Sequence, residues 1–263
     1  MIRRPPRSTQ GVSSAASDVY KRQISYIGKN FHGWQIQENS KTIQSEVDVA
    51  ISKLFKKDIK TVGSGRTDTG VHALSQVAHF DYEKEINNDF IYRVNSVLPN
   101  DISINSIKEV KDDVSGRFDA ISREYIYKIH TFKSPFLNHL SFFYKTKIDV
   151  DLINETCSQL MAYSDFQSFS KVKTDVNNYN CKIKTAHIKK INNTYLFTIS
   201  SNRFLRGMVR AIVGTLLQVN ENKKSLSMFD KIILGKDRKL AGPSVPAHGL
   251  YLSKVTYKSD IFI

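Results

Sequence analysis

Apolar residues along this chain change from strand spacing to helix spacing twice in the same order, and that order restricts the fold more than any other feature. Strand-like alternation begins at Ile24 and ends in turn residues around Gly28. A helix pattern follows, with Thr42 as the expected N-cap and with the apolar residues Ile43, Val47, Ala50, Ile51 and Leu54. After a glycine-containing loop, a second alternating strand spans residues 78–82.

The rest of the chain repeats this order, although no sequence repeat accompanies it. The further elements that the spacing predicts are a helix over 90–97, strands over 102–110 and 125–129, a helix over 152–163, a strand over 195–199, a helix over 204–219 and a strand over 250–257. Strands and helices in this order predict an α+β fold made of two related halves. We expect a largely antiparallel mixed sheet with helices on one face.

Two composition changes indicate where the parts of the chain divide. The charged residues Lys111–Asp113, followed by Gly116, predict a boundary between an N-terminal half, 24–113, and a C-terminal half, 114–263. Residues 1–23 are rich in Arg, Ser and Pro and show no apolar periodicity. Two interpretations fit this segment. It is either an organelle transit peptide, which has this composition, or a foreign start fused to a truncated first strand. We favour the second interpretation, because nothing in the segment forms an amphipathic helix, and expect 1–23 to be a non-native or disordered leader outside the fold.

Charge points to a polyanionic partner. The 263 residues include 39 Lys plus Arg against 25 Asp plus Glu, a formal net charge of +14, and the basic residues are dispersed along the chain. A dispersed excess suits a broad nucleic-acid-binding surface better than a basic tail, and the alternative is a lysine-rich solvated surface. The sheet face without helices is the expected place for RNA.

The cysteines and the apolar runs argue for a cytoplasmic protein without metal. Cys157 and Cys181 form no CxxC pair and have no clustered histidines beside them, which predicts free thiols in a reducing compartment. No apolar run approaches the ~20 residues of a membrane-spanning helix. We therefore expect no membrane association and no metal site.

The segment with the most specific pattern is 63–73, GSGRTDTGVHA. It resembles the GRTDAGVHA signature of the TruA-type tRNA pseudouridine synthases, and the similarity continues through residues 76–80, QVAHF. One departure is Thr69, where the family usually has Ala. Nearly everything after Gln23 resembles the family, in segments with the right order: FHGWQIQ at 31–37, REYIY at 123–127, DFQSF at 165–169, FLRGMVR at 204–210 and PAHGL at 246–250. Ile27 and the leader depart from the family's first strand.

The resemblance implies a catalytic carboxylate, Asp68, that acts as the nucleophile. It also implies that Arg210 forms an ion pair with Asp68, since a guanidinium favours and orients the charged carboxylate. Arg206, which we expect one helical turn earlier on the same face, is the alternative partner. Either arginine would otherwise contact phosphate. No cofactor is implied, and no phosphate-binding loop or dinucleotide motif is present in the sequence.

The remaining site residues are expected around a uridine that has left its stack. By resemblance, Tyr125 stacks on the flipped uracil and relays a proton, Arg66 contacts the backbone and fills the vacated space, and Leu250 is an apolar wall. His72 is expected to bind substrate or to serve a structural role. Tyr127 is expected in the core. His32, His72 and His248 match family positions that are not metal ligands.

The resemblance implies an isomerase that converts uridines 38, 39 and 40 in the anticodon arm of tRNA to pseudouridine and works as a homodimer. Recognition of several neighbouring uridines suits contacts to shape and phosphate. Two alternatives remain at this point: a pseudouridine synthase with another RNA target, and a catalytically silent RNA-binding protein.

Overall fold

A computed structural model describes residues 18–87, 89–111, 114–172, 176, 178–222 and 226–263. Within these ranges, nine strands form one sheet, in which β4-β1-β3-β9-β5-β8-β7 are consecutive neighbours, β2 pairs with β3 and β6 pairs with β5. The strands are β1 (Asp18–Tyr26), β2 (Val62–Gly63), β3 (His72–Tyr82), β4 (Ile102–Val110), β5 (Ser122–His130), β6 (Phe142–Phe143), β7 (Ile183–Ile191), β8 (Thr194–Ser201) and β9 (Leu250–Thr256). Neighbours are antiparallel except for β3–β9 and β5–β6. The expected α+β class with a largely antiparallel mixed sheet is confirmed.

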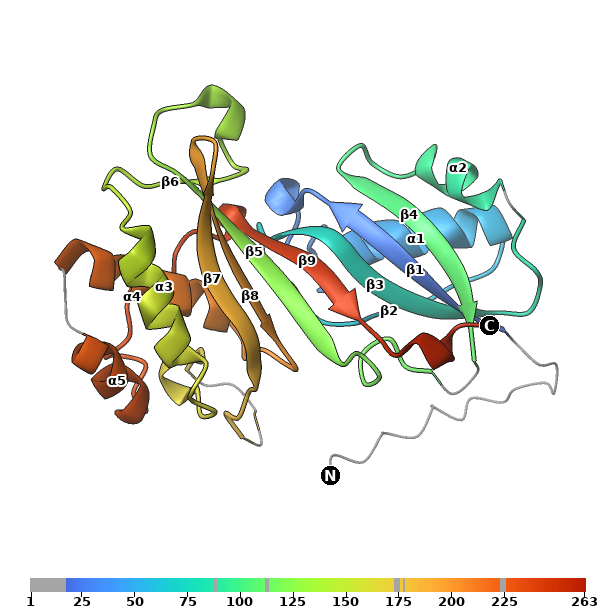
Figure 1. Ribbon diagram of the computed structural model, residues 1–263. Coiled ribbons are helices and arrows are strands. Elements are labelled where there is room, and N and C mark those ends of the chain that lie inside the picture. The colour runs from blue at the N-terminus through green and yellow to red at the C-terminus, as the bar shows by residue number, and fades with distance from the viewer. Residues whose placement is uncertain (1–17, 88, 112–113, 173–175, 177, 223–225) are drawn as a thin grey trace.

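Helices accompany both ends of this sheet (Figure 1). The α-helices in the described residues are α1 (Ile43–Phe55), α2 (Phe90–Asn95), α3 (Val150–Leu160), α4 (Met208–Asn222) and α5 (Leu226–Leu234). Short 3-10 turns are η1 (Gly28–Asn30), η2 (Pro135–Leu137), η3 (Gln167–Phe169), η4 (Ala247–Gly249) and η5 (Ser259–Ile261). Helices α1 and α2 share one hydrophobic cluster with β1, β3 and β4, and helices α3, α4 and α5 share another with β5, β7 and β8. Each half of the chain therefore has its own core.

The last strand joins the two halves. β9 runs parallel to β3 and antiparallel to β5, so the end of the chain returns to the middle of the sheet (Figure 1). The expected boundary at residue 113 falls on residues 112 and 113, which lie outside the described residues. Division into 24–113 and 114–263 remains a proposal, which the separate clusters support and the central place of β9 qualifies.

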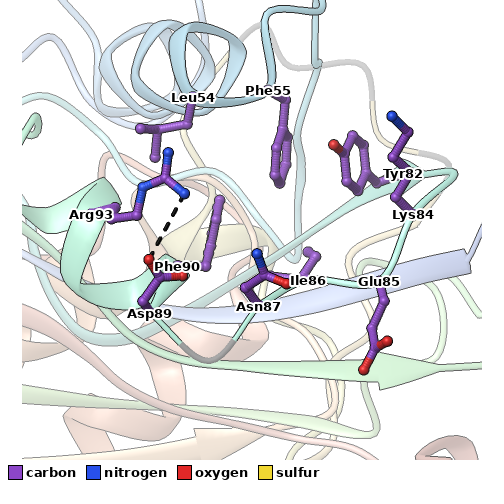
Figure 2. Close-up of a pocket in the computed structure, with 10 residues that line it drawn as sticks. All are labelled: Leu54, Phe55, Tyr82, Lys84, Glu85, Ile86, Asn87, Asp89, Phe90 and Arg93. Carbon is purple, nitrogen blue, oxygen red and sulfur yellow. Dashed lines mark ion pairs between the residues drawn. The ribbon is translucent and has the colours of Figure 1, made fainter.

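Helix α1 forms where its sequence pattern predicts it. Thr42 caps it in a reciprocal arrangement with Ser45: the Thr42 side chain accepts from the Ser45 backbone N–H, and the Ser45 side chain accepts from the Thr42 N–H. At its other end, the Phe55 ring lies between Tyr82 and Phe90, with centroid distances of 3.8 and 5.0 Å (Figure 2). This stack closes the N-terminal core beside a surface pocket of about 330 Å³. The ion pair of Asp89 and Arg93 at the pocket rim is half exposed and contributes little stability.

β1 begins at Asp18, ahead of the expected strand start at Ile24, so residues 18–23 of the expected leader lie within the sheet. Residues 18–23 pair with β3 on one side, and residues 19–23 pair with β4 on the other. Val19 and Tyr20 are 0% and 5% exposed. The short alternation at 18–20, set among polar residues, gave no recognisable strand signal. Residues 1–17 of the expected leader lie outside the described residues.

This position of β1 predicts two different outcomes of truncation. Deletion of residues 1–23 removes two buried apolar side chains, at about 1.5–3 kcal/mol each, and leaves facing edges of β3 and β4 unpaired. Because domains are stable by only about 5–15 kcal/mol, we expect a large fall in melting temperature and soluble yield. Deletion of residues 1–17 keeps the whole strand and is the matched control, with an expected melting temperature close to that of the full chain. Equal stability of the two truncated proteins would contradict this role of residues 18–23.

Helix α4 starts later than the sequence pattern predicts. The expected helix over 204–219 begins at Met208, and Gly207 has a φ of +73°, which lies outside the helical region. Arg206 is therefore in the turn before the helix, and Arg210 is in its first turn. The two arginines do not share one helical face, contrary to expectation.

Candidate active site

Asp68 lies in the loop between β2 and β3, at the point where the chain turns into β3. The Val71 N–H donates to the Asp68 carbonyl at 3.1 Å, which closes a tight turn. The Asp68 side chain is 35% exposed. The hydrogen-bonded turn holds the Asp68 backbone in place, and the partly exposed carboxylate is available to a ligand.

Gly33 supports the Asp68 loop from below. The Trp34 N–H donates to the Thr67 carbonyl at 3.2 Å, which draws the 31–37 segment against the loop. Gly33 has a φ of +84°, and a Cβ there would lie 2.4 Å from the Thr67 oxygen. Only glycine satisfies both the backbone angle and this approach. The HGWQ segment therefore fixes the position of the backbone that carries Asp68.

Buried polar groups fix the two ends of the same loop. The Ser64 hydroxyl donates to the Gln76 Oε1 at 2.6 Å, and the Gln76 Nε2 donates to the Gly65 carbonyl at 3.0 Å. Closer to Asp68, the Tyr26 and Thr67 hydroxyls are 2.8 Å apart. Burial raises the pKa of the Tyr26 phenol well above its ordinary value, so this phenol stays protonated.

Arg123 ties the loop to the C-terminal half. Its guanidinium donates to the carbonyls of Ser64 (2.8 Å), Arg117 (2.7 Å), Ala120 (3.3 Å) and Asn202 (3.2 Å). Burial lowers the pKa of this guanidinium, although arginine remains charged near pH 7. Among these contacts the Arg123 guanidinium has no carboxylate partner, and the four carbonyl oxygens stabilise its positive charge instead. Arg123 thus has a structural role at the start of β5, which sequence reasoning missed because only the tyrosines of the REYIY segment at 123–127 were assigned roles.

Tyr125 lies on β5 within electrostatic reach of Asp68. It pairs with Leu252 of β9 and Ile199 of β8. Burial raises the pKa of the Tyr125 phenol to about 12; the positive charge of Arg123 opposes this rise, and the negative charge of Asp68 adds to it. Tyr125 is consequently a neutral phenol near pH 7. Phe204 contacts it edge to face at a centroid distance of 5.2 Å, and this aromatic neighbour was not among the expected site residues.

The arginine beside Asp68 is Arg206, not Arg210 as expected. The Arg206 Nε lies 3.7 Å from the Asp68 Oδ1, and the Arg206 side chain is 60% exposed. Arg210 instead donates from Nε to the Val245 carbonyl at 2.7 Å, and the Val245 N–H donates to the Arg210 carbonyl. Arg210 therefore holds the chain just before the PAHGL segment, while the more exposed Arg206 reaches the carboxylate from the turn ahead of α4.

The structure separates the other expected site residues by exposure. Arg66 is exposed, two residues from Asp68, and is available to a ligand. Leu250 is 6% exposed and pairs with Tyr127, which is fully buried and donates to the Pro246 carbonyl at 2.8 Å. Tyr127 is thus a core residue, as expected. His72 is 0% exposed, which corrects its expected role in substrate binding and leaves the structural alternative.

Metal sites and membrane spans were also considered from the sequence. Across the described ranges, no three metal-ligating side chains are grouped closely enough for a metal ion. No helix in the same ranges has both the length and the apolar character that a bilayer crossing requires. The pocket of Figure 2 lies at the end of α1, and its lining includes none of the residues discussed for the Asp68 site.

Comparisons with known proteins agree with the motifs around Asp68. A family model described as tRNA pseudouridine synthase matches residues 23–119 and 157–258. A tRNA pseudouridine synthase A of Parabacteroides distasonis is 44% identical over 242 residues, which is 91% of this chain and 96% of the relative. Proteins of the same name from Bacteroides fragilis and Bacteroides thetaiotaomicron are 45% and 42% identical, over 91% of this chain and 96% and 90% of the relatives.

Proposed function

The chain belongs to the tRNA pseudouridine synthase family, and from this premise we propose that it converts uridines 38, 39 and 40 of tRNA to pseudouridine with Asp68 as the nucleophile. The reaction class is that of an isomerase acting on tRNA. The observation that carries the assignment of Asp68 is its position: a partly exposed carboxylate on a loop held by Gly33, Gln76 and Arg123, with Tyr125 close enough to sense its charge.

The chemistry needs a carboxylate and a controlled environment. The bond from C1′ of ribose to N1 of uracil breaks, the base rotates, and C5 bonds to C1′. C5 loses its proton and N1 gains one, so no net oxidation occurs. Attack on C1′, attack on C6, and proton abstraction toward a glycal-like intermediate each place the work on a carboxylate. Asp68 supplies that group in all three routes.

The neighbouring residues of Asp68 take supporting roles in this proposal. Arg206 stabilises the charged carboxylate and, because it is 60% exposed, is also available to a phosphate of the RNA. Arg66 contacts the backbone beside the flipped nucleotide, whose unstacking costs a few kcal/mol. Leu250, which is 6% exposed, is proposed as an apolar wall against the base.

The choice of uridines is tested by mapping the product. An unmodified tRNA transcript with uridines at 38, 39 and 40 is incubated with the enzyme, and pseudouridine is located by carbodiimide adduct formation and primer extension. We expect adducts at these positions and none after each uridine is replaced by cytidine. Adducts confined to another arm of the tRNA would contradict the proposed target while leaving the reaction class intact.

Tyr125→Phe separates stacking from proton relay. The variant keeps the ring and its edge contact with Phe204 but lacks the hydroxyl. If the phenol relays the C5 proton, we expect turnover to fall about 10²-fold with little change in RNA affinity. Single-turnover rates at saturating enzyme measure this change. Phe204→Leu is the companion variant, which alters the aromatic neighbour and keeps the hydroxyl. A wild-type rate in Tyr125→Phe would show that the hydroxyl has no part in the reaction.

We also propose a homodimer in the cytoplasm, with the segment 131–144 as the contact surface. Phe132, Phe136 and Phe143 are 41%, 87% and 39% exposed there. The segment carries one lysine and no acidic residue, in a chain of net charge +14, so two copies meet on it with little charge repulsion. The outer strand β7, by contrast, carries three lysines, which disfavour pairing between sheet edges. The free, buried Cys157 and Cys181 suit a reducing compartment.

Phe136→Asp tests the dimer surface. A charge at the most exposed aromatic of the segment is expected to convert the dimer to a monomer in analytical ultracentrifugation. Tyr92→Asp on α2 is the matched control, because Tyr92 is also an exposed aromatic, at 79%. A monomeric wild type would contradict the dimer, and a dimeric Phe136→Asp would contradict this surface.

A further inference from the structure

Four segments that are distant in sequence meet at the imidazole of His72, and we call this meeting point the junction. The ring stands at the start of β3 and is 0% exposed. The Gly28 N–H, from the turn after β1, donates to its Nδ1 at 3.0 Å. Its Nε2 lies 3.0 Å from the His139 carbonyl and 3.1 Å from the His248 carbonyl. These contacts join the β1 turn, the 131–144 segment and the turn before β9.

The hydrogen bonds settle which nitrogen carries the proton. A backbone N–H always donates, so Nδ1 must accept from Gly28 and is unprotonated. The two atoms facing Nε2 are carbonyl oxygens, which only accept, so Nε2 carries the hydrogen and shares it between them. Every contact is satisfied only by the neutral imidazole with its proton on Nε2. A second proton on Nδ1 would face the Gly28 N–H and remove that bond.

The surroundings of the ring favour the neutral form. Burial is the main cause that lowers the pKa of His72, and the charges of His248 and Lys128 lower it further, against the opposing effect of the two carbonyls. The Tyr251 ring packs on the imidazole at a centroid distance of 4.6 Å. The Lys128 ammonium lies 4.0 Å from the centroid of the Tyr251 ring, and the Tyr251 hydroxyl donates to the Leu140 carbonyl. The titratable groups facing the junction are thus His139, His248, Lys128 and Tyr251.

The junction around His72 is connected to Asp68 through the backbone. His72 follows Val71, whose N–H closes the turn on the Asp68 carbonyl. Gly28 packs on Val71 so closely that a Cβ would lie 2.0 Å from the Val71 oxygen. On the other side, His248 precedes Leu250 by two residues, in the segment that Arg210 holds through Val245. A shift of the ring would therefore move the Asp68 turn relative to the turn before β9.

We propose that His72 is a positioning residue for the isomerisation: its neutral imidazole sets the Asp68 loop against the turn that leads into β9. The inference rests on the proposed role of Asp68. His72 touches no RNA, since its ring is enclosed. Its loss acts on the geometry of the chemical step and not on the binding of tRNA.

Two substitutions each keep one side of the junction. His72→Asn offers an amide oxygen near the position of Nδ1 and keeps an acceptor for Gly28. His72→Gln offers amide hydrogens near the position of Nε2 and keeps a donor for the two carbonyls. We expect kcat to fall 10- to 100-fold in both variants, with KM within about threefold of wild type, because displacements near 1 Å at a reacting centre have effects of this size. Melting curves establish that each variant is folded.

The pH profile distinguishes positioning from a general loss of structure. Wild type is expected to lose kcat reversibly as the pH falls below 6.5, where protonation of His72 breaks the Gly28 bond. His72→Gln should lack this acid limb. His248→Gln is the matched control: it removes a neighbouring imidazole but keeps the backbone carbonyl that His72 contacts, so the limb should remain.

Several results would overturn the inference. These are wild-type kcat in both His72 variants, a raised KM with unchanged kcat, and an acid limb in His72→Gln at the same pH as in wild type. If neither His72 variant folds, the profiles of wild type and His248→Gln decide, and absence of an acid limb in kcat at every pH below 6.5 at which wild type stays folded refutes the role. Failure of wild type to form pseudouridine at any pH would refute the proposed function instead.

Discussion

Asp68→Asn is expected to lower turnover by about 10³-fold or more, equivalent to about 4 kcal/mol of activation free energy. The amide has nearly the shape of the carboxylate but cannot act as a nucleophile or accept a proton. Fold and RNA affinity should survive, because the loop is held through backbone contacts of Thr67 and Asp68 and the lost ion pair with Arg206 is largely exposed. Single-turnover rates and equilibrium tRNA binding, measured on the same preparation, separate the two effects.

The control for this variant is Asp58→Asn, which removes the same charge from an exposed carboxylate that pairs with Lys60 on the surface. Its rate should match wild type. A fall in the turnover of Asp68→Asn much smaller than about 10³-fold would contradict the assignment of Asp68. Loss of tRNA binding together with turnover would show that the substitution damaged more than the chemical step.

Gly33→Ala is expected to cost about 3 kcal/mol of stability and to lower turnover about 100-fold. A positive φ costs a non-glycine residue about 1–2 kcal/mol, and the new methyl group, 2.4 Å from the Thr67 oxygen, must be relieved by movement of the backbone. The backbone that moves is the one that carries Asp68. Urea unfolding and single-turnover rates measure the two effects.

Gly65→Ala is the matched control for Gly33→Ala. Gly65 lies in the same loop, and a Cβ there would meet no atom within 4 Å. Its stability and rate should stay near wild type. If Gly33→Ala turned over at the wild-type rate, the 31–37 segment would not set the position of Asp68.

Much of the fold was predictable because local patterns and tertiary packing agree there. The helix from Ile43, capped by Thr42, and the alternation of Ala78, Phe80 and Tyr82 appear as expected, since their apolar faces meet in one core. β7 and α5 were missed. Lysines and a histidine occupy the outward positions of β7, and α5 is short, so neither gave a clear period.

The loop that carries Asp68 was recognisable from its motif, whereas its contacts were not. Spacing alone suggested that Arg206 and Arg210 share a helix face. The positive φ of Gly207 instead makes the helix begin after it, and Arg210 donates a hydrogen bond to the Val245 carbonyl. The burial of His72 likewise depends on His139 and His248, which are 67 and 176 residues away. Such contacts follow from the sheet order, which places β9 beside β3, and local periodicity carries no record of it.

In the first strand, tertiary pairing produced an element that the local sequence pattern did not predict. Residues 18–23 have a composition that resembles the leader before them, yet they lie between β3 and β4. Pairing on both sides supplies backbone hydrogen bonds whatever the side chains are. A tertiary position can therefore impose a strand on a weak local pattern, as here.

The most direct test of the account is release of tritium from tRNA labelled at C5 of uridine, because rejoining the base through C5 must remove that hydrogen. Wild type is expected to release tritium from an unmodified transcript, Asp68→Asn to release none, and a transcript with cytidine at 38, 39 and 40 to give no release with either protein. Tritium release by Asp68→Asn at the wild-type rate, or no release by a wild type that binds the tRNA, would contradict the account.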